Sequence, residues 1–536
     1  MTNETFDYII IGSGSSGSIV AFRLQEFFPN KKILLIESGS SDNKLTVTIP
    51  AGYGYLFYND KVNWKYKTEK IDGLNGRQDY WPKGKILGGS SSINAMVYIR
   101  GQQNDYNNWK INNWSWKDVL PYFLKIENHY LGKSKYHNTD GYINISNIED
   151  EAHILTHKFI ESCVNQGFKK NNDFNGESQE GAGLFQLNTN NGKRSSVSKE
   201  YLRKIKNKNF KILKKCHVSK IIIKDNVAIG IEYIRKSKKF IANANNEIIL
   251  SAGSISSPQI LQLSGIGDFD HLKKFNLDRN MHLASVGKNL QDHPNIALHY
   301  KSKIKSLNDD LRPLHNKIIF FLRWFFNKKG PLTLSINQAG AFIKSDKQIS
   351  DPDLQIYFLP LTATSSGKVG NLSVSPDPFS GFTIAPSLCR PQSRGFVNIN
   401  STNPIDHPSI NPNYYDREED LNLMVKAYKI SKKISETIPL RDFIDTKIGP
   451  HKNVDNDDEI KEFIKNYSKT TYHPVGTCSM GMDKKTSVVD SDLRVHGIKN
   501  LRVADASIMP KIISGNTNSA CMMIGEKCAD LIKESL

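Results

Sequence analysis

A glycine-rich turn near the N-terminus is the first stretch whose residue types and spacing could do chemistry. Gly12, Gly14 and Gly17 form a G-x-G-x-x-G pattern, and Glu37 follows twenty positions after Gly17. Glycines permit a tight turn and a close approach of the backbone to a pyrophosphate, and a carboxylate at this distance accepts a hydrogen bond from a ribose hydroxyl. The pattern therefore predicts a dinucleotide site, although the turn alone does not separate FAD from NAD.

The elements that must position this turn can also be read from the sequence. Residues 6–11 form an apolar, β-branched run, residues 19–24 continue with helical spacing, and residues 32–36 form a second apolar run that ends on Glu37. Strand, turn, helix and strand in this order place the free N–H groups of a helix N-terminus against the pyrophosphate. We expect an α/β chain built on a Rossmann-type parallel sheet. No arginine stands beside Glu37, which suits an adenosine with a free 2′-hydroxyl.

Length and composition predict a protein of more than one domain. The 536 residues exceed what one compact core usually organises, and 38% of them are hydrophobic. No apolar run approaches the roughly 18 residues of a membrane span, and the first run is short and follows Glu4, so we expect no secretory signal. The six cysteines form no C-x-x-C pair and the histidines lack ligand spacing. We therefore predict no metal site and a cytoplasmic location.

The formal charge of +18 has two interpretations. It could attract an anionic membrane or a nucleic acid. The lysines are dispersed along the chain, however, and no nucleic-acid-binding motif accompanies them. We favour a solvated basic surface and expect no nucleic-acid partner.

Two later stretches carry a family resemblance. Residues 84–98 combine adjacent glycines, three serines and an asparagine before an apolar run that we expect to be a helix or strand, and residues 253–267 read GSISSPQILQLSGIG. Both resemble the signatures of the glucose–methanol–choline (GMC) family of FAD-dependent oxidoreductases, with closest similarity to its choline dehydrogenase-like branch. Residues 291–294, 472–478 and 501–507 continue the resemblance, which covers nearly the whole chain.

The resemblance implies that the dinucleotide is FAD. It places Val218 near the adenine and the Ala252–Gly253 turn beside the pyrophosphate. Ile93 stands where some relatives attach FAD through a histidine, so we predict non-covalent FAD. The expected cofactor-binding residues are Gly12, Ser13, Gly14, Ser15, Gly17, Glu37, Ser38, Gly89, Ser90, Asn94, Ala95, Met96, Val97, Val218, Ala252, Gly253, Asp505, Ala506 and Thr517.

The expected domain organisation is discontinuous. The resemblance implies an FAD-binding domain from residues 1–155, 195–300 and 468–536. It assigns residues 156–194 and 301–467 to a substrate domain, an antiparallel sheet flanked by helices. The sequence itself predicts a hairpin over 216–233, a parallel strand over 247–253, strands at 354–358 and 395–399, and a helix over 421–434. Residues 155–195 read as polar loop.

His473 is the candidate catalytic base. Oxidation of an alcohol by a flavin needs a base for the hydroxyl proton, and histidine titrates near neutrality. The string around His473 resembles the catalytic string of the family, and Asn516 occupies the position of a partner that orients the substrate oxygen. The alternative for Asn516 is a helix N-cap. His293, in Gln-Asp-His-Pro, reads as structural rather than catalytic.

Gln338 and Tyr472 are the expected substrate residues. In choline-oxidising relatives a glutamate precedes a Gly-x-Phe-type strand, and aligning residues 340–342 with that strand places neutral Gln338 at the glutamate position. This favours an uncharged primary alcohol over choline. The alignment could be wrong by one residue, or Asp353 could supply the charge.

Several functional alternatives stay open at this stage. The leading interpretation is an alcohol dehydrogenase that passes electrons to a quinone or another redox carrier. The alternatives are a choline dehydrogenase, an oxidase that uses oxygen, a flavin-retaining lyase, and a light-driven decarboxylase suggested by Cys389 before Arg390 and opposed by the His473–Asn516 pair. Residues 316–329 are aromatic-rich with basic flanks. We expect a buried helix of the substrate domain there, with a peripheral helix at the inner face of the membrane as the alternative.

Overall fold

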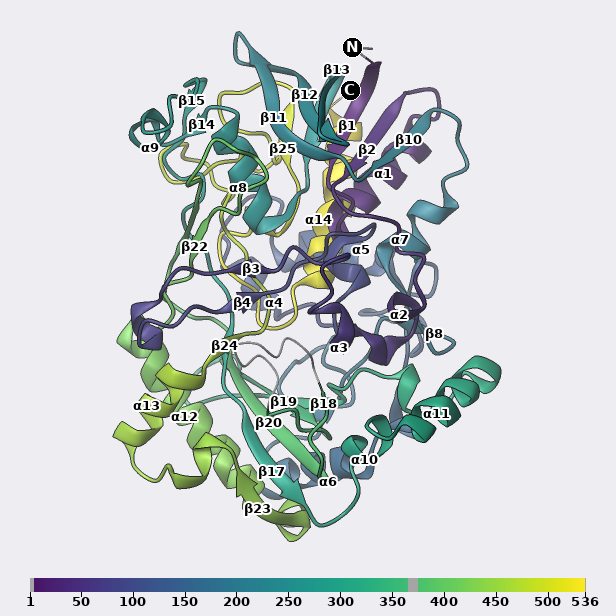
Figure 1. Cartoon of the computed structure of the whole chain (residues 1–536), viewed down its shortest axis with the longest axis vertical. Helices are drawn as coiled ribbons and strands as arrows, with labels where there is room; N and C mark the ends of the chain where they lie inside the picture. The colour runs from purple at the N-terminus through teal and green to yellow at the C-terminus, as the bar shows by residue number, and fades with distance from the viewer. Residues whose placement is uncertain (1–3, 365–374, 536) are drawn as a thin grey trace.

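Two sheets organise the chain, and the computed structural model describes residues 4–364 and 375–535 (Figure 1). In the first sheet, β1 (Glu4–Ile11) lies between β2 (Ile33–Glu37) and β13 (Lys238–Leu250), parallel to both. The parallel strands β10 (Phe210–Lys214) and β25 (Leu501–Val503) pair with β2 and β13. The sequence therefore correctly predicted a Rossmann-type parallel sheet.

An antiparallel hairpin extends this first sheet. Strands β11 (His217–Lys224) and β12 (Val227–Arg235) pair with each other, and β12 pairs with β13. Asp225 and Asn226 both have positive φ, as a two-residue hairpin turn requires. The predicted hairpin is confirmed.

Helices α1 (Ser15–Phe27) and α14 (Asn518–Glu534) pack against each other although they come from opposite ends of the chain. Arg23 forms a buried ion pair with Glu526, with 2.7 Å between Nε and Oε2. A Cβ atom at Gly525 would lie 2.7 Å from the carbonyl oxygen of Ser16, so glycine is needed at this close crossing. The C-terminal helix thus returns to the region of the first sheet.

The second sheet is antiparallel and lies in the lower half of Figure 1. Its strand order is β23–β17–β20–β19–β18–β7, and β16 (Pro294–Asn295) and β24 (Lys469–Thr470) pair at its side. Helix α12 (Glu418–Ser435) packs against β20, and α6 (Ile154–Asn165) packs against β7 and β18. The other strands of this sheet are β7 (Gly181–Leu184), β17 (Leu298–Ser302), β18 (Ala339–Ile343), β19 (Leu354–Leu359), β20 (Gly381–Leu388) and β23 (Ile444–Ile448).

The remaining elements are further helices and short paired strands. The helices are α2 (Leu45–Thr48), α3 (Tyr53–Leu56), α4 (Gln103–Asn107), α5 (Trp116–Ile126), α7 (Val197–Glu200), α8 (Gly253–Leu263), α9 (Phe269–Lys273), α10 (Leu307–Leu311), α11 (Leu314–Asn327) and α13 (Asp457–Tyr467). The paired short strands are β3 (Tyr66–Lys67) with β4 (Tyr80–Trp81), β5 (Glu127–His129) with β6 (Ile143–Ile145), β8 (Thr189–Asn190) with β9 (Lys193–Arg194), β14 (Ile266–Gly267) with β15 (Met281–His282), and β21 (Phe396–Asn398) with β22 (Ser409–Asn411).

Three local predictions are wrong. Residues 155–195 are not loop throughout, because α6 begins there and buries Leu155, Phe159 and Cys163 against the second sheet. The run after Ser92 forms neither helix nor strand, because the turn at Gly89–Ser92 leads into irregular backbone. Helix α11 forms, but it is not buried: Trp324 is its one buried side chain.

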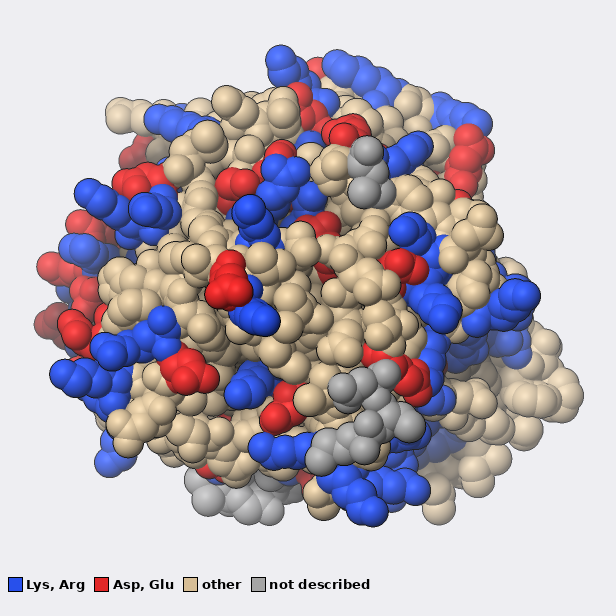
Figure 2. Space-filling model, turned by 90° about the horizontal axis from the view of Figure 1, so that it is seen from above, with Lys and Arg blue, Asp and Glu red and all other residues tan. Residues whose placement is uncertain are grey.

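The predicted strands at 354–358 and 395–399 and the helix at 421–434 correspond to β19, β21 and α12 and are confirmed. In the described ranges, no helix combines the length and apolar character needed to cross a bilayer. Figure 2 shows Lys and Arg over one face of the molecule, interspersed with Asp and Glu.

Candidate active site

A cavity of about 1220 Å³ is lined by residues from both sheets. Ligand pockets commonly have volumes of roughly 300–1,000 Å³, so this cavity can hold a ligand larger than a typical small molecule. Its walls include the glycine turn, Glu37, the end of β13, and the segments around His473 and Asn516. It is the region where the sequence predicts cofactor and substrate to meet.

The glycine turn is shaped to admit a ligand. A Cβ atom at Gly14 would have no neighbouring atom within 4 Å, so a side chain there would fill the cavity instead of striking protein. Gly12 has a φ of +96°, and its Cβ would lie 2.5 Å from the carbonyl oxygen of Ser251. Gly17 does not line the cavity, and its Cβ would lie 2.1 Å from the carbonyl oxygen of Gly12. Gly14 therefore leaves ligand space, whereas Gly12 and Gly17 allow the chain to pack.

Glu37 ends β2 at the cavity wall. Its Oε2 accepts hydrogen bonds from the backbone N–H of Ser13 at 3.0 Å and from the Ser13 hydroxyl at 2.7 Å, while Oε1 accepts from the N–H of Gly39 at 2.7 Å. Burial raises the pKa of this carboxyl group. Each carboxylate oxygen can accept more than one hydrogen bond, so Oε1 retains capacity for a ribose hydroxyl. Ser13 thus acts by holding Glu37 and does not itself line the cavity.

The second signature forms the opposite part of the cofactor region. Gly253 begins α8 with a φ of +86°, and its Cβ would also meet no atom within 4 Å. Its N–H donates to Oδ2 of Asp505 at 2.8 Å, and the Ser257 hydroxyl donates to the same oxygen at 2.6 Å. Two open glycine positions at helix N-termini, together with the Glu37 acceptor, fit the phosphates and ribose of FAD.

The structure brings most of the predicted site residues to this one cavity. His473, Asn516 and Tyr472 line it, whereas Ser13, Gly17 and Gln338 do not. The predicted cofactor residues that line it are Gly12, Gly14, Ser15, Glu37, Ser38, Gly89, Ser90, Asn94, Ala95, Met96, Val97, Val218, Ala252, Gly253, Asp505, Ala506 and Thr517.

The imidazole of His473 lies in a directed hydrogen-bond network. Nε2 of His293 is 3.0 Å from the carbonyl oxygen of Cys389, so that nitrogen must carry a hydrogen. Nδ1 of neutral His293 is then an acceptor, and it lies 3.0 Å from Nδ1 of His473. The His473 proton therefore sits on Nδ1. Its Nε2 presents a lone pair, which is the state that a general base requires.

Asn516 completes the network on the other side of His473. Its Nδ2 lies 3.2 Å from Nε2 of His473, and its Oδ1 accepts from Nε2 of Gln355 at 3.4 Å. Gln355 in turn accepts from the Tyr357 hydroxyl at 2.9 Å. Asn516 is therefore oriented as a donor toward the lone pair of His473. Helix α14 takes Thr517 as its N-cap, so Asn516 is not the capping residue.

Burial dominates the acid–base properties of the site. It lowers the pKa of His473 well below the usual range, and the nearby His293 and Lys83 act in the same direction. Burial also lowers the pKa of His293 to about 4. Both imidazoles are therefore neutral at physiological pH, as the hydrogen-bond directions require.

Asp292 and Lys83 fix the backbone that carries His473. Oδ1 of Asp292 accepts from the N–H of His473 at 2.7 Å, and Nζ of Lys83 donates to the carbonyl oxygen of Tyr472 at 2.5 Å. Burial raises the pKa of Asp292 to about 6 and lowers that of Lys83 to about 8. Sequence reasoning missed these roles and that of His293, although the Gln-Asp-His-Pro string marked the neighbourhood.

Gln338 points away from the cavity. Its Oε1 accepts from the N–H of His153 and from the Thr156 hydroxyl, at 2.8 and 2.9 Å, at the start of α6. The cavity residue is the preceding Asn337. The side chain of Asp353 accepts from Ser345 and lies outside the lining. Among the described residues that line the cavity, Glu37 and Asp505 are the only carboxylates, and both belong to the cofactor region.

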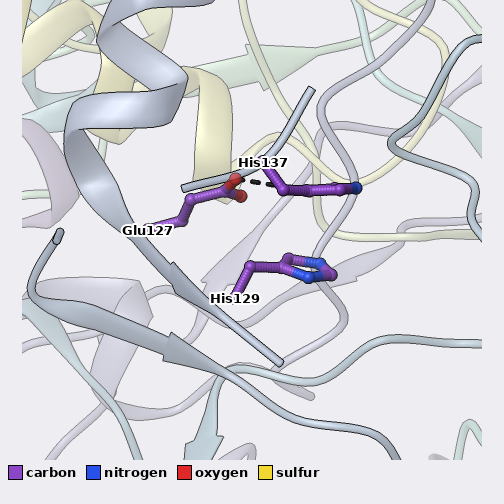
Figure 3. A group of neighbouring side chains, drawn as sticks. All are labelled: Glu127, His129 and His137. Carbon is purple, nitrogen blue, oxygen red and sulfur yellow. Dashed lines mark hydrogen bonds and ion pairs between the residues drawn. The ribbon is translucent and has the colours of Figure 1, made fainter. Parts of the chain in front are cut away.

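A separate group of Glu127, His129 and His137 has the spacing of metal ligands, with potential ligand atoms within 4.8 Å of one another (Figure 3). Two of the three side chains, Glu127 and His137, already have charged partners within the protein. Arg100 forms an ion pair with Glu127, and His137 lies between Glu127 and Asp173 at 3.1 and 2.8 Å. The guanidinium charge opposes a divalent cation, so the group is better described as a buried ion-pair network.

The comparisons with known proteins agree with this geometry. Two family models described as GMC oxidoreductase match residues 6–295 and 391–525. The chain belongs to the GMC oxidoreductases. This GMC oxidoreductase is 37% identical over 535 residues to an alcohol dehydrogenase (acceptor) of Pseudomonas putida, with coverage of 98% of the chain and 95% of the relative. It is 36% identical over 545 residues to the mitochondrial choline dehydrogenase of Homo sapiens, with coverage of 99% and 90%.

Solved structures of this family share the fold. Pyridoxine 4-oxidase from Mesorbium loti matches with a TM-score of 0.89 at 28% identity, with 99% of each chain covered. Formate oxidase matches with a TM-score of 0.92 at 26% identity, covering 100% of this chain and 99% of that one. The protein is thus an FAD-dependent oxidoreductase that acts on CH–OH groups, as the sequence predicted.

Proposed function

We propose that this GMC oxidoreductase oxidises an uncharged primary alcohol to an aldehyde, with His473 as the base. FAD, when bound, supplies the acceptor for the carbinol hydrogen, which leaves as a hydride. Nε2 of His473 takes the hydroxyl proton, because His473 lines the cavity and its Nδ1 is held by His293. The amide of Asn516 donates to that same nitrogen at 3.2 Å and, once an alcohol is bound, is the donor that orients the substrate oxygen.

Among the described residues that line the cavity, none on the substrate side is a carboxylate, and this observation carries the choice of substrate. A quaternary ammonium is usually held by aromatic faces together with a nearby negative charge. The described lining supplies aromatic and aliphatic side chains, including Tyr53, Tyr357 and Leu361. It also includes the cationic residues Arg77, Lys83 and Lys469, which would repel choline. Asn337, the cavity residue next to the position predicted for the glutamate of choline-oxidising relatives, is neutral.

Choline remains the second candidate, because a relative of 36% identity is named choline dehydrogenase and aromatic rings surround the site. The comparison that tests the choice is the anaerobic rate of flavin reduction by choline and by 3,3-dimethylbutanol, its neutral isostere. We expect faster reduction by the neutral alcohol. A strong preference for choline would contradict the proposal.

We also propose that FAD is held without a covalent bond. Ile93 has no group that could bond to a flavin, so acid precipitation should release FAD into the supernatant; flavin retained in the pellet would contradict this.

We propose a quinone or another redox carrier as the electron acceptor, with the protein in the cytoplasm or at the inner face of the membrane. The division into an FAD domain and a substrate domain is supported by the two sheets. Strands β16 and β24 and the start of β17 belong to the second sheet, although they lie in segments predicted for the FAD domain.

A further inference from the structure

Helix α11 exposes an apolar surface that no other described part of the chain covers. Of its 14 residues, Trp324 is the only one that is buried. Six of its large apolar side chains are exposed, with exposed fractions from 47% for Leu322 to 73% for Leu314 and Phe326. The exposed residues are Leu314, Ile318, Ile319, Leu322, Phe325 and Phe326. Contiguous exposed apolar patches of this kind mark interaction sites on soluble proteins.

These six side chains share one face of the helix. At 3.6 residues per turn they fall within an arc of roughly 140°. The exposed Lys317 and Arg323 lie on the two sides of that arc. An apolar face bordered by cations is the arrangement of helices that lie in the plane of a membrane surface.

The helix is held firmly enough to present this face. Nε1 of Trp324 donates to the carbonyl oxygen of Gly192 at 2.6 Å, and Nδ2 of Asn316 donates to the carbonyl oxygen of Asp309 at 3.0 Å. Arg323 lies 3.9 Å from Glu151. In Figure 1, α11 projects outward from the side of the molecule beside the second sheet.

The charge of the sequence around α11 indicates which kind of surface its apolar face would bind. From Leu311 to Ser345 the chain contains no acidic residue, whereas it contains six basic ones: Arg312, Lys317, Arg323, Lys328, Lys329 and Lys344. An anionic lipid surface attracts each such charge. A second copy of the chain packed symmetrically on α11 would instead bring like charges together.

We propose that α11 docks this protein on an anionic bilayer, with the apolar face in the headgroup region and the basic residues against the lipid charges. The segment leading into α11 reaches the active site, because Leu307 of α10 packs with Tyr53, Met96 and Leu361 of the cavity wall. Docking here would place the cavity near a bilayer that dissolves apolar alcohols and quinones. That last consequence, but not the docking itself, rests on the proposed function.

Flotation of the FAD-loaded enzyme with vesicles tests the docking. The vesicles are phosphatidylcholine alone, or phosphatidylcholine mixed with phosphatidylglycerol. We expect binding to the mixed vesicles and a loss of binding as salt is raised. Replacing Phe325 and Phe326 together by serine should weaken binding by about a hundredfold, or roughly tenfold for each aromatic ring. Lys317→Glu should weaken it by at least about fivefold.

Ile405→Ser is the matched control, because Ile405 is also exposed, at 58%, and lies outside α11. Its binding should equal that of the unmodified enzyme. Equal binding of the Phe325/Phe326 double variant would overturn the proposal, and so would equal binding to neutral and anionic vesicles. A change in oligomeric state in that variant, with no vesicle binding by the unmodified enzyme, would assign the face to a second copy. Flavin reduction by alcohol, measured without vesicles, tests the proposed function separately.

Discussion

Nδ1 of His293 lies 3.0 Å from Nδ1 of His473, and this contact decides which nitrogen of His473 is basic. Nε2 of His293 donates to the Cys389 carbonyl oxygen and therefore carries the hydrogen of the neutral ring. Nδ1 of His293 can then only accept a hydrogen bond. His473 must then donate from Nδ1, which leaves the lone pair at Nε2 beside Asn516. His293 is thus a positioning residue, which acts through His473.

Replacing His293 by alanine should remove this control of the tautomer. We expect the limiting rate of anaerobic flavin reduction to fall by about one to two orders of magnitude, with little change in substrate affinity, because the base itself remains. His293→Asn should be faster than His293→Ala, since the amide oxygen of the new asparagine can still accept a hydrogen bond from Nδ1 of His473. Cys389→Ala is the control and should be silent, because the carbonyl that binds His293 belongs to the backbone. Equal rates in His293→Ala and unmodified enzyme would refute the assignment.

The low pKa of His473 predicts the pH dependence of reduction. The reactive form is the neutral imidazole, and a depressed pKa keeps that form populated to lower pH. The rate of flavin reduction should therefore hold constant from neutral pH down through 6.5 and fall only well below it. Stopped-flow measurements across this range check the expectation. An acid limb centred at or above pH 6.5 would contradict the network.

Two glycines that look alike in the sequence should respond differently to substitution. Gly14→Val should fold but bind FAD poorly, because its side chain enters the cavity without striking protein and the native φ of −70° suits any residue. Gly12→Val should destabilise the fold itself by several kcal/mol, since its Cβ would clash with Ser251 at a positive φ. Flavin content and thermal unfolding distinguish the two. A stable Gly12→Val protein with normal FAD would show that this account of the turn is wrong.

The network around His137 should make stability depend on pH. Burial alone would lower the pKa of His137, but hydrogen bonds to Asp173 and Glu127 outweigh it and raise the pKa. A raised folded-state pKa means that the stabilisation is complete below pH 6.5 and is lost as pH rises through the folded-state value. His137→Asn should therefore cost about 2 kcal/mol near pH 6 and less near pH 9. Urea unfolding at both pH values tests this. A cost that grows with pH would contradict the charged state of His137.

The sequence was most informative where function is local. The turn at Gly12–Gly17 and the strands beside it follow from residues close together in the chain, and both were predicted. Helix α6 was missed, although Leu155, Phe159 and Cys163 have helical spacing, because polar residues between them obscured the apolar face. The exposure of α11 could not be predicted, since periodicity indicates an apolar face but not what covers it.

Most of the predicted site residues line one cavity, but the sequence did not reveal how they are arranged within it. Resemblance brought His473 and Asn516 together, and the structure places their nitrogens 3.2 Å apart. The partnership of His293 with His473 spans 180 positions, so no local pattern could reveal it. A one-residue difference in strand register turns Gln338 toward α6 and Asn337 toward the cavity.

The most direct test of the account is anaerobic flavin reduction by a neutral primary alcohol in the unmodified enzyme and in His473→Ala. We expect 3,3-dimethylbutanol to bleach the flavin of the unmodified enzyme. His473→Ala should retain FAD but bleach about two to four orders of magnitude more slowly, the usual contribution of a general base. Asn516→Ala should lose less, because it removes a hydrogen bond but not the base. Bleaching of His473→Ala at the unmodified rate would contradict the central claim.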